Sequence, residues 1–104
     1  MIIEMKKKEV ELKFTFNSFK YMQDFDIKAL DEIESKPFKI VPMLETLLMG
    51  AVNSNPKVKF TSNDVQEFLE IYVENESITE LLEVLMGSLQ ESSFFKSLQK
   101  NPQK

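Results

Sequence analysis

Acidic side chains are the chain's main candidates for catalysis or metal binding. The sequence contains no histidine and no cysteine, so it lacks the commonest proton shuttle, a thiol nucleophile and the preferred ligands of transition metals. Its two glycines, Gly50 and Gly87, are too few for a glycine-rich phosphate-binding loop. We therefore expect no enzyme activity, no cofactor and no catalytic residues, which leaves the carboxylates to be considered.

The segment DFDIKALDEIES, residues 24–35, has the acidic character of a calcium-binding loop. Lys28 stands at the fifth loop position, where an oxygen ligand is needed, and Ala29 replaces the turn glycine. Ser35 replaces the glutamate that would bind calcium through both oxygens. We therefore expect no metal site, and interpret the acidic side chains as solvated or helix-capping charges: Asp24, Asp26, Asp31 and Glu32. The function that remains is binding.

Charge is distributed unevenly along the chain. The net charge is −4, but residues 60–95 contain eight acidic side chains and no lysine or arginine, whereas residues 1–59 contain ten basic and nine acidic ones. Binding to phosphates requires clustered cations, so residues 60–95 form a poor nucleic-acid surface. They form either a solvated acidic face or a docking surface for a basic partner.

Length and composition predict a single globular domain. The chain has 104 residues, of which 42% are apolar and 29% charged. We expect one domain over residues 1–104, with residues 1–8 and 99–104 as flexible ends. The sequence has no cysteine, no signal-peptide pattern and no apolar run of about 18 residues. These features predict a cytoplasmic protein without a membrane span.

The segment EVELKFTF, residues 9–16, alternates between apolar and polar side chains. This period of two predicts a strand with one buried face. A strand must pair with another segment, because its ladder hydrogen bonds need partners. We expect the partner to be FKIV at 38–41, VKF at 58–60 or a second copy of the chain.

The sequence pattern in the middle of the chain predicts helices, and two of their boundaries have alternatives. Residues 17–33 indicate one helix, capped by Asn17 or Ser18, with a break near Asp26 as an alternative. Residues 37–42 allow either an extended segment before a helix from Pro42 or a kinked helix from Pro37. An apolar stripe then predicts the helix itself, through Met43, Leu44, Leu47, Leu48 and Ala51.

Two capped helices complete the predicted fold. Thr61 with Asp64, and Ser77 with Glu80, form capping boxes before apolar stripes of helical spacing. The short ENES segment between them predicts an antiparallel helix pair. After Gly87 the second helix either continues or breaks before a last turn. The predicted class is mainly α, with four to five helices preceded by a β-strand or by a short β-hairpin.

Apolar side chains exceed what one small core can hold. The sequence has nine phenylalanines, two tyrosines and six methionines in addition to its aliphatic stripes. Surplus apolar side chains indicate an interface. Our candidate partner-binding residues are Phe94, Phe95, Leu98, Met86 and Leu89. For Phe94 and Phe95 the alternative is that the rings close the protein's own core.

The order of these segments resembles a known protein family. The strand ending KFTFNSF, the helix MLETLLMGAV, the threonine-capped acidic helix and the terminal SSFF are similar to segments of tail assembly chaperones. These proteins come from long-tailed phages and prophages of Gram-positive bacteria. The resemblance spans residues 9–98 and consists of apolar and capping patterns without a catalytic signature.

The resemblance implies a small, mainly helical protein that keeps the long, apolar, helical tape measure protein soluble while the tail tube assembles. It implies absence from the mature virion, and a longer frameshifted form that contacts the tail tube protein. From the surplus apolar residues and the unpaired strand we also expect a homo-oligomer, and we expect neither nucleic-acid nor membrane binding. The alternative is a small acidic helical regulator or DNA mimic, with DNA contact through Lys6, Lys7 and Lys8 as its weaker form.

Overall fold

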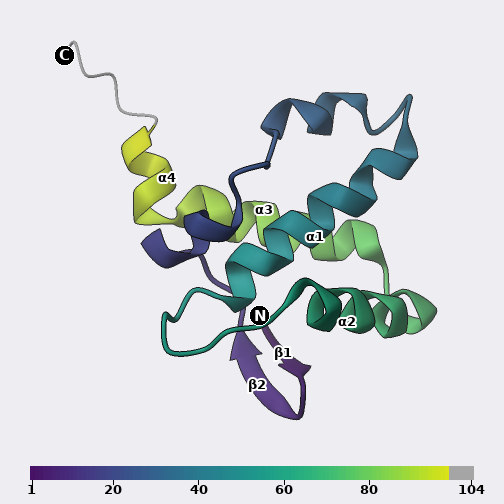
Figure 1. The fold of residues 1–104 in the computed structure, drawn as a ribbon. Coiled ribbons are helices and arrows are strands. Elements are labelled where there is room, and N and C mark those ends of the chain that lie inside the picture. The colour runs from purple at the N-terminus through teal and green to yellow at the C-terminus, as the bar shows by residue number, and fades with distance from the viewer. Residues whose placement is uncertain (99–104) are drawn as a thin grey trace, which may run out of the picture.

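The computed structural model describes residues 1–98, apart from the side chains of Ile27, Leu30 and Leu98. Over these residues a two-stranded antiparallel hairpin is followed by three 3-10 helices and four α-helices (Figure 1). The predicted class, a mainly α-helical small domain with an N-terminal hairpin, is therefore confirmed. Residues 99–104, which we expected to be a flexible end, lie outside the described residues.

The hairpin pairs strand β1, Ile2–Met5, with strand β2, Lys8–Glu11. Lys6 and Lys7 form the two-residue turn, with φ angles of 55° and 65°. Positive φ at both turn positions is typical of the type I′ turn, whose twist matches that of the paired strands. Lysine is an unusual choice there, because side chains other than glycine and asparagine are disfavoured at positive φ.

The pairing corrects two expectations from the sequence. Only residues 9–11 of the strand predicted at 9–16 lie in β2, and residues 12–15 lie outside both strands. Strand β2 pairs with residues 2–5, which we expected to be flexible, and not with 38–41, 58–60 or a second copy. A two-residue turn brings these strands together at a small cost in loop entropy, whereas the other segments are far along the chain. The strand no longer provides a reason for self-association, so the homo-oligomer remains a prediction that depends on the apolar surface alone.

The early helical region consists of two 3-10 helices, η1 at Phe16–Tyr21 and η2 at Ile27–Glu32. The alternative of a break near Asp26 is confirmed, but the predicted caps are wrong. Thr15 precedes the first turn: its N–H donates to Ser18 Oγ over 2.9 Å, and Ser18 N–H donates to Thr15 O over 2.9 Å. Tertiary hydrogen bonds of this segment, described below, hold it in short turns.

Residues 37–42 are helical throughout. The 3-10 helix η3, Pro37–Lys39, continues directly into α1, Ile40–Val52. Pro37 and Pro42 both lie within the first turn of their helices, where a missing N–H removes no intrahelical bond. The extended FKIV segment is therefore wrong, and Phe38 and Val41 become neighbours on successive turns.

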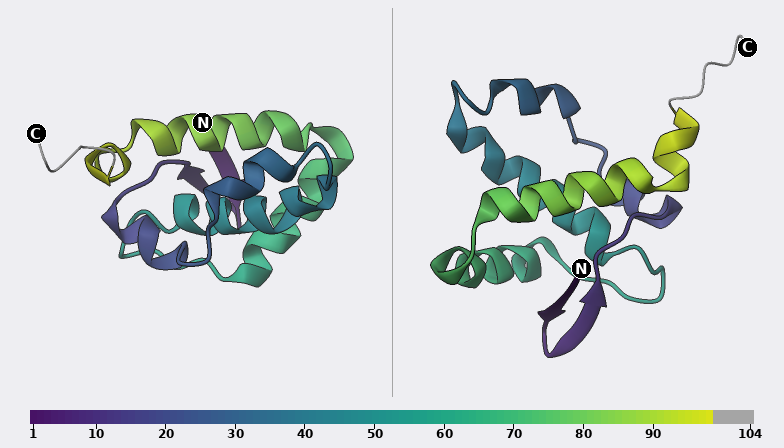
Figure 2. Two further views of the ribbon diagram at one scale, coloured as in Figure 1. Left: turned by 90° about the horizontal axis from the view of Figure 1, so that it is seen from above. Right: turned by 180° about the vertical axis from the view of Figure 1, so that it is seen from behind.

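Helix α1 is the centre of the domain, and η1, α2 and α3 all pack against it (Figures 1 and 2). Helix α2 spans Ser62–Asn75 and helix α3 spans Ile78–Glu91. We expected α2 and α3 to form an antiparallel pair, but α2 packs mainly against α1, and α3 packs against α1 and α4. The fully buried side chains come mostly from α1 and α3: Leu47, Leu48, Leu81, Leu85 and Leu89.

Gly50 permits the close approach of η1 to α1. A Cβ atom at this position would collide with Met22 Sδ and lie 3.2 Å from Ser18 O. The absence of a side chain therefore lets the 3-10 turns of η1 lie directly on the helix.

The two predicted capping boxes are confirmed to different extents. Thr61 and Asp64 exchange both bonds, with Asp64 N–H donating to Thr61 Oγ1 over 3.2 Å and Thr61 N–H donating to Asp64 Oδ2 over 2.8 Å. For Ser77, only the bond from Glu80 N–H to its Oγ is present in the described residues. Helix α3 continues past Gly87 to Glu91, and the short helix α4, Ser93–Leu98, follows.

A buried asparagine joins the end of α1 to the start of α2. Asn53 is 0% exposed, and its side-chain amide donates to Met49 O over 2.9 Å and to Phe60 O over 3.1 Å. Its Oδ1 accepts a hydrogen bond of 2.7 Å from Phe60 N–H. Asn53 O accepts from Asn17 Nδ2 over 2.7 Å, and the neighbouring Ser54 O accepts from Thr15 Oγ1 over 2.6 Å. We call this set of bonds the Asn53 junction.

We predict that Asn53→Ala lowers the free energy of unfolding by about 3 kcal/mol, because it leaves buried polar groups of Phe60 and Met49 without partners. The measurement is urea unfolding followed by circular dichroism. Asn55→Ala is the control: Asn55 is exposed and its side chain accepts one bond, of 2.9 Å, from Lys57 N–H, so its cost should stay below about 1 kcal/mol. Equal costs for the two variants would contradict the importance of the junction.

Candidate functional site

The described residues contain no cluster typical of metal chemistry. Within residues 1–98, no three histidine, cysteine, aspartate or glutamate side chains come close enough together to hold a metal ion. Asp26 Oδ1 accepts a hydrogen bond of 2.9 Å from Lys28 N–H, and Glu32 pairs with Lys39. Lys39 holds the pKa of the Glu32 carboxyl below its usual value. These two carboxylates therefore stabilise local turns.

None of the helices described among residues 1–98 has the length and apolar character that crossing a bilayer requires.

The five candidate partner-binding residues do not form one surface. Met86 and Leu89 are buried in the hydrophobic core, so they are not available to a partner. Phe95 is half-buried against that core, and Phe94 is half-buried outside it. The side chain of Leu98 lies outside the described residues. The apolar stripe of α3 is buried in the protein's own core, which sequence periodicity alone does not reveal.

Phe94 holds α4 against η1 through its aromatic ring. Its ring centroid lies 4.6 Å from that of Phe19 and 5.2 Å from that of Phe16, with a T-shaped arrangement in the second pair. Such pairs contribute about 0.5–1.5 kcal/mol each beyond the area they bury. Ser92 sets the direction of α4, since its Oγ accepts from Phe95 N–H over 3.2 Å. Phe94 thus makes intramolecular contacts, and Phe16 remains 68% exposed beside it.

A first apolar groove lies between α1 and α2; we call it the α1–α2 groove. It has a volume of about 280 Å³. Val41 and Val73 line it and are exposed, Leu69 is half-buried within it, and Glu45 and Glu70 add carboxylates. Its other lining residues are Leu44, Gln66 and Ile78.

Phe38 extends the apolar surface at this groove. It precedes Val41 by three residues on continuous helical turns, a spacing that places side chains on neighbouring positions of one face. Its ring is 86% exposed, the highest value among the large apolar side chains described. Sequence reasoning missed this surface because the FKIV segment allowed a strand. The adjacency of Phe38 and Val41 on a helix was the available signal.

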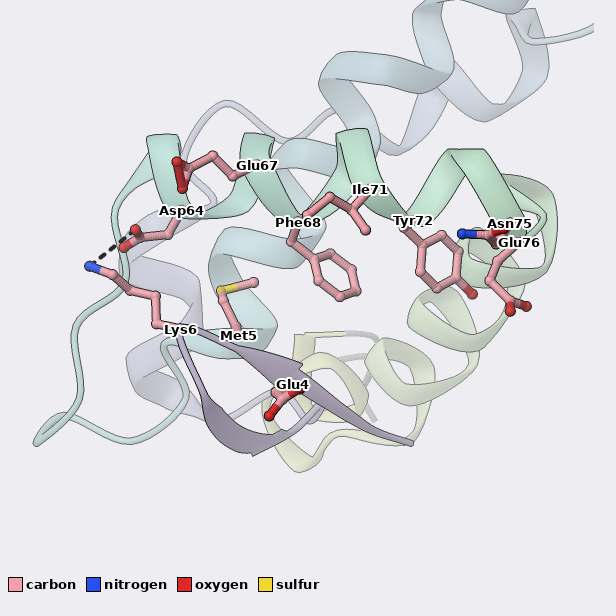
Figure 3. A pocket seen from close by; sticks show the side chains of 10 residues that line it. All are labelled: Glu4, Met5, Lys6, Asp64, Glu67, Phe68, Ile71, Tyr72, Asn75 and Glu76. Carbon is pink, nitrogen blue, oxygen red and sulfur yellow. Dashed lines mark ion pairs between the residues drawn. The ribbon is translucent and has the colours of Figure 1, made fainter.

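A second groove, which we call the β1–α2 groove, separates strand β1 from the other side of α2 (Figure 3). Its volume is about 470 Å³. Phe68, Ile71 and Tyr72 project from α2 into it, and Met5 lies opposite them on the hairpin. Ile71 is 66% exposed. The remaining lining residues are polar or charged: Glu4, Lys6, Asp64, Glu67, Asn75 and Glu76.

An ion pair connects the two walls of the β1–α2 groove. Lys6 Nζ lies 3.2 Å from Asp64 Oδ1, and Asp64 is largely buried. The bond from Thr61 N–H, reinforced by Lys6, holds the pKa of the Asp64 carboxyl below its usual value. At the other end of the groove, burial and the nearby Glu76 and Glu80 raise the pKa of the Tyr72 hydroxyl. The groove therefore contains an ionised carboxylate and a neutral phenol at neutral pH.

Lysines from two separate segments surround a hollow of about 320 Å³ beside the hairpin. We call it the lysine patch. Lys6 and Lys8 come from the hairpin, and Lys57 and Lys59 from the loop before α2. The sequence singled out only residues 6–8, because the approach of the loop depends on the fold.

No protein-family model, no curated protein and no solved structure matches this chain.

We predict that Asp64→Asn destabilises the protein at pH 7 and that this effect shrinks as the pH falls below about 4. The folded-state pKa of Asp64 is lowered, so its stabilising contribution is present above the unfolded-state pKa and is lost as the pH falls through the folded-state pKa. The measurement compares urea midpoints of the two proteins at pH 7 and pH 3. Asp31→Asn, at an exposed position, is the control.

Proposed function

We propose that this protein is a tail assembly chaperone that binds an apolar helical segment of a tape measure protein and keeps it soluble. The α1–α2 groove is the observation that supports this proposal most strongly. Val41 and Val73 line it and are exposed, and the exposed Phe38 lies one helical turn before Val41, next to the groove and not among its lining residues. Single exposed apolar residues are ordinary, but a group of them beside a groove is typical of a docking surface.

The shape and chemistry of the groove suit an amphipathic helix. Such a helix binds by placing apolar residues three and four positions apart into a hydrophobic groove. The groove lies between two helices, and its carboxylates, Glu45 and Glu70, stay in contact with water at its edge. Burying one exposed phenylalanine side chain contributes about 1.5–3 kcal/mol to the free energy of binding. Phe38, Val41 and Val73 together would therefore give appreciable affinity.

The acidic surface of α2 and α3 supports the same proposal from the side of solubility. Residues 60–95 contain eight acidic side chains and no basic ones. A chaperone bound to an apolar chain must keep the complex in solution. A surface that carries many charges of one sign makes such complexes repel one another and so opposes their association. The resemblance of residues 9–98 to the chaperone family supplies the identity of the partner.

The test is co-expression with a helical fragment of the tape measure protein encoded in the same genome, with solubility and co-purification as readouts. Phe38→Ser combined with Val41→Ser should reduce the recovered fragment at least about tenfold, which corresponds to about 1.4 kcal/mol of binding free energy. Both side chains are exposed, so the variant should unfold in urea close to the parent protein.

Two further variants make the test specific. Val84→Ser removes an exposed valine from α3, outside the groove, and should leave co-purification within about twofold of the parent. Phe94→Ser tests the C-terminal site that the sequence suggested, and on our proposal it weakens the docking of α4 more than the binding of the fragment. If the fragment is neither more soluble nor co-purified with the unmutated protein, the proposal is wrong.

The lysine patch favours a second candidate function, a small regulator that contacts DNA. Lys6 is already paired with Asp64, so the other three lysines on phosphates predict that the logarithm of the association constant falls with the logarithm of salt concentration with a slope of about −2.7. The measurement is binding to duplex DNA by fluorescence anisotropy between about 50 and 200 mM salt. Lys57→Gln with Lys59→Gln should reduce the slope to about −0.9. If the protein leaves the anisotropy of the duplex unchanged, the DNA-binding candidate is wrong.

A further inference from the structure

The outer edge of β1 has backbone groups that do not take part in the hairpin. Leu12 N–H donates to Met1 O over 2.9 Å, which makes residues 1 and 12 a hydrogen-bonded pair. In an antiparallel ladder such pairs alternate, so Ile3 and Met5 bond to β2. The N–H and C=O groups of Ile2 and Glu4 therefore point to the other side of β1.

The two edges of the hairpin have different surroundings. The outer edge of β2 faces the loop of residues 53–60, since Val10 and Val58 line one hollow together. The outer edge of β1 faces α2, and Glu4, Met5 and Lys6 line the β1–α2 groove (Figures 1 and 3). A strand edge beside an open groove is a template on which another extended chain can pair.

The opposite wall of the groove offers apolar contacts for alternate side chains of such a chain. Phe68 and Tyr72 lie on successive turns of α2 with ring centroids 5.4 Å apart, and Ile71 is exposed beside them. Side chains of an added strand alternate between the two faces of the sheet. One set would pack on Phe68 and Tyr72, and the other set would face the solvent side of β1, where Glu4 lies.

Charge decides the chemistry of the occupant. The groove is lined by four carboxylates and one lysine, and that lysine, Lys6, is paired with Asp64. Glu4, Glu67 and Glu76 remain without a lysine partner among the groove residues. A chain that carries lysine or arginine beside its apolar residues would neutralise these three carboxylates.

We propose that the β1–α2 groove binds an extended segment of another polypeptide, with alternating apolar and basic residues, by adding it as a third strand to β1. Main-chain hydrogen bonds to Ile2 and Glu4 provide affinity, and the apolar wall and the carboxylates provide specificity. This site is separate from the α1–α2 groove and takes a chain in a different conformation. It therefore does not depend on the proposed function.

A second copy of this chain is a poorer occupant. Two copies paired through β1 would bring two acidic grooves, each with its own Glu4, Glu67 and Glu76, into one interface. Like charges placed together across an interface cost several kcal/mol. A basic partner meets no such repulsion.

The test uses the full chain and the peptide acetyl-Lys-Val-Lys-Phe-Lys-Val-amide, with binding followed by amide chemical shifts at physiological ionic strength. We expect saturable shifts at Ile2, Glu4 and the α2 wall, and at least tenfold weaker binding of the matching peptide with glutamate in place of lysine. Two isomers carry backbone N-methyl groups on alternate residues. Only one set of amides can face β1, so one isomer should lose binding at least tenfold and the other should retain it.

Charge-reversal variants locate the site. Glu67→Lys with Glu76→Lys should weaken binding of the lysine peptide at least tenfold, while Glu83→Lys, an exposed site on α3 outside the groove, should change it less than about twofold. Urea unfolding checks that all variants fold. Equal affinity for the two N-methyl isomers, or for the lysine and glutamate peptides, overturns the proposal. Concentration-dependent dimerisation that protects the Ile2 and Glu4 amides overturns it in favour of a second copy.

Discussion

The buried amide of Asn53 determines how the segments of this protein are placed relative to one another. Hydrophobic burial is not directional, so the apolar stripes of α1 and α3 alone would allow several arrangements of the chain around them. The Asn53 side chain ties the last turn of α1 to Phe60 at the start of α2, and the backbone carbonyl oxygen of Asn53 accepts a hydrogen bond from the Asn17 side chain. The end of α1, the start of α2 and the distant residue 17 therefore meet at one fully satisfied polar site, which is costly to disturb in a low-dielectric interior.

This placement explains why α2 has a groove on each side. Its first turn is fixed by the Thr61–Asp64 capping box and by the junction at Phe60, and Val65 is its only apolar residue counted in the buried core. The rest of α2 is therefore positioned from its N-terminal end and not by being enclosed. Phe68 and Tyr72 face the hairpin, while Leu69 and Val73 face α1. One half-covered helix thus provides walls for two grooves of different chemistry.

The sequence predicted local features well and long-range ones poorly. The cap at Thr61 depends on residues within one turn of each other, so its pattern is visible in the chain. The sequence left open whether α3 breaks after Gly87, and the break before α4 falls at Ser92. The hairpin was only an alternative, because Lys6-Lys7 lacks the Asn-Gly type of signal that a type I′ turn normally shows. No sequence pattern marks the role of Asn53, since its partners lie up to 36 positions away. The candidate surface moved from Met86 and Leu89 to Phe38 for the same reason: periodicity identifies an apolar stripe but not the neighbour that covers it.

The Lys6–Asp64 pair couples the position of the hairpin to the surrounding electrolyte. One partner is mostly exposed and the other is largely buried, so dissolved ions reach the pair from the lysine side. Mobile ions weaken such an attraction over about 8 Å at physiological ionic strength. Since this pair spans the opening between β1 and α2, concentrated salt favours a wider and more variable opening there, while the α1–α2 groove has no comparable cross-link among its lining residues. The two surfaces of α2 therefore differ in how rigidly they are preformed under a given ionic condition.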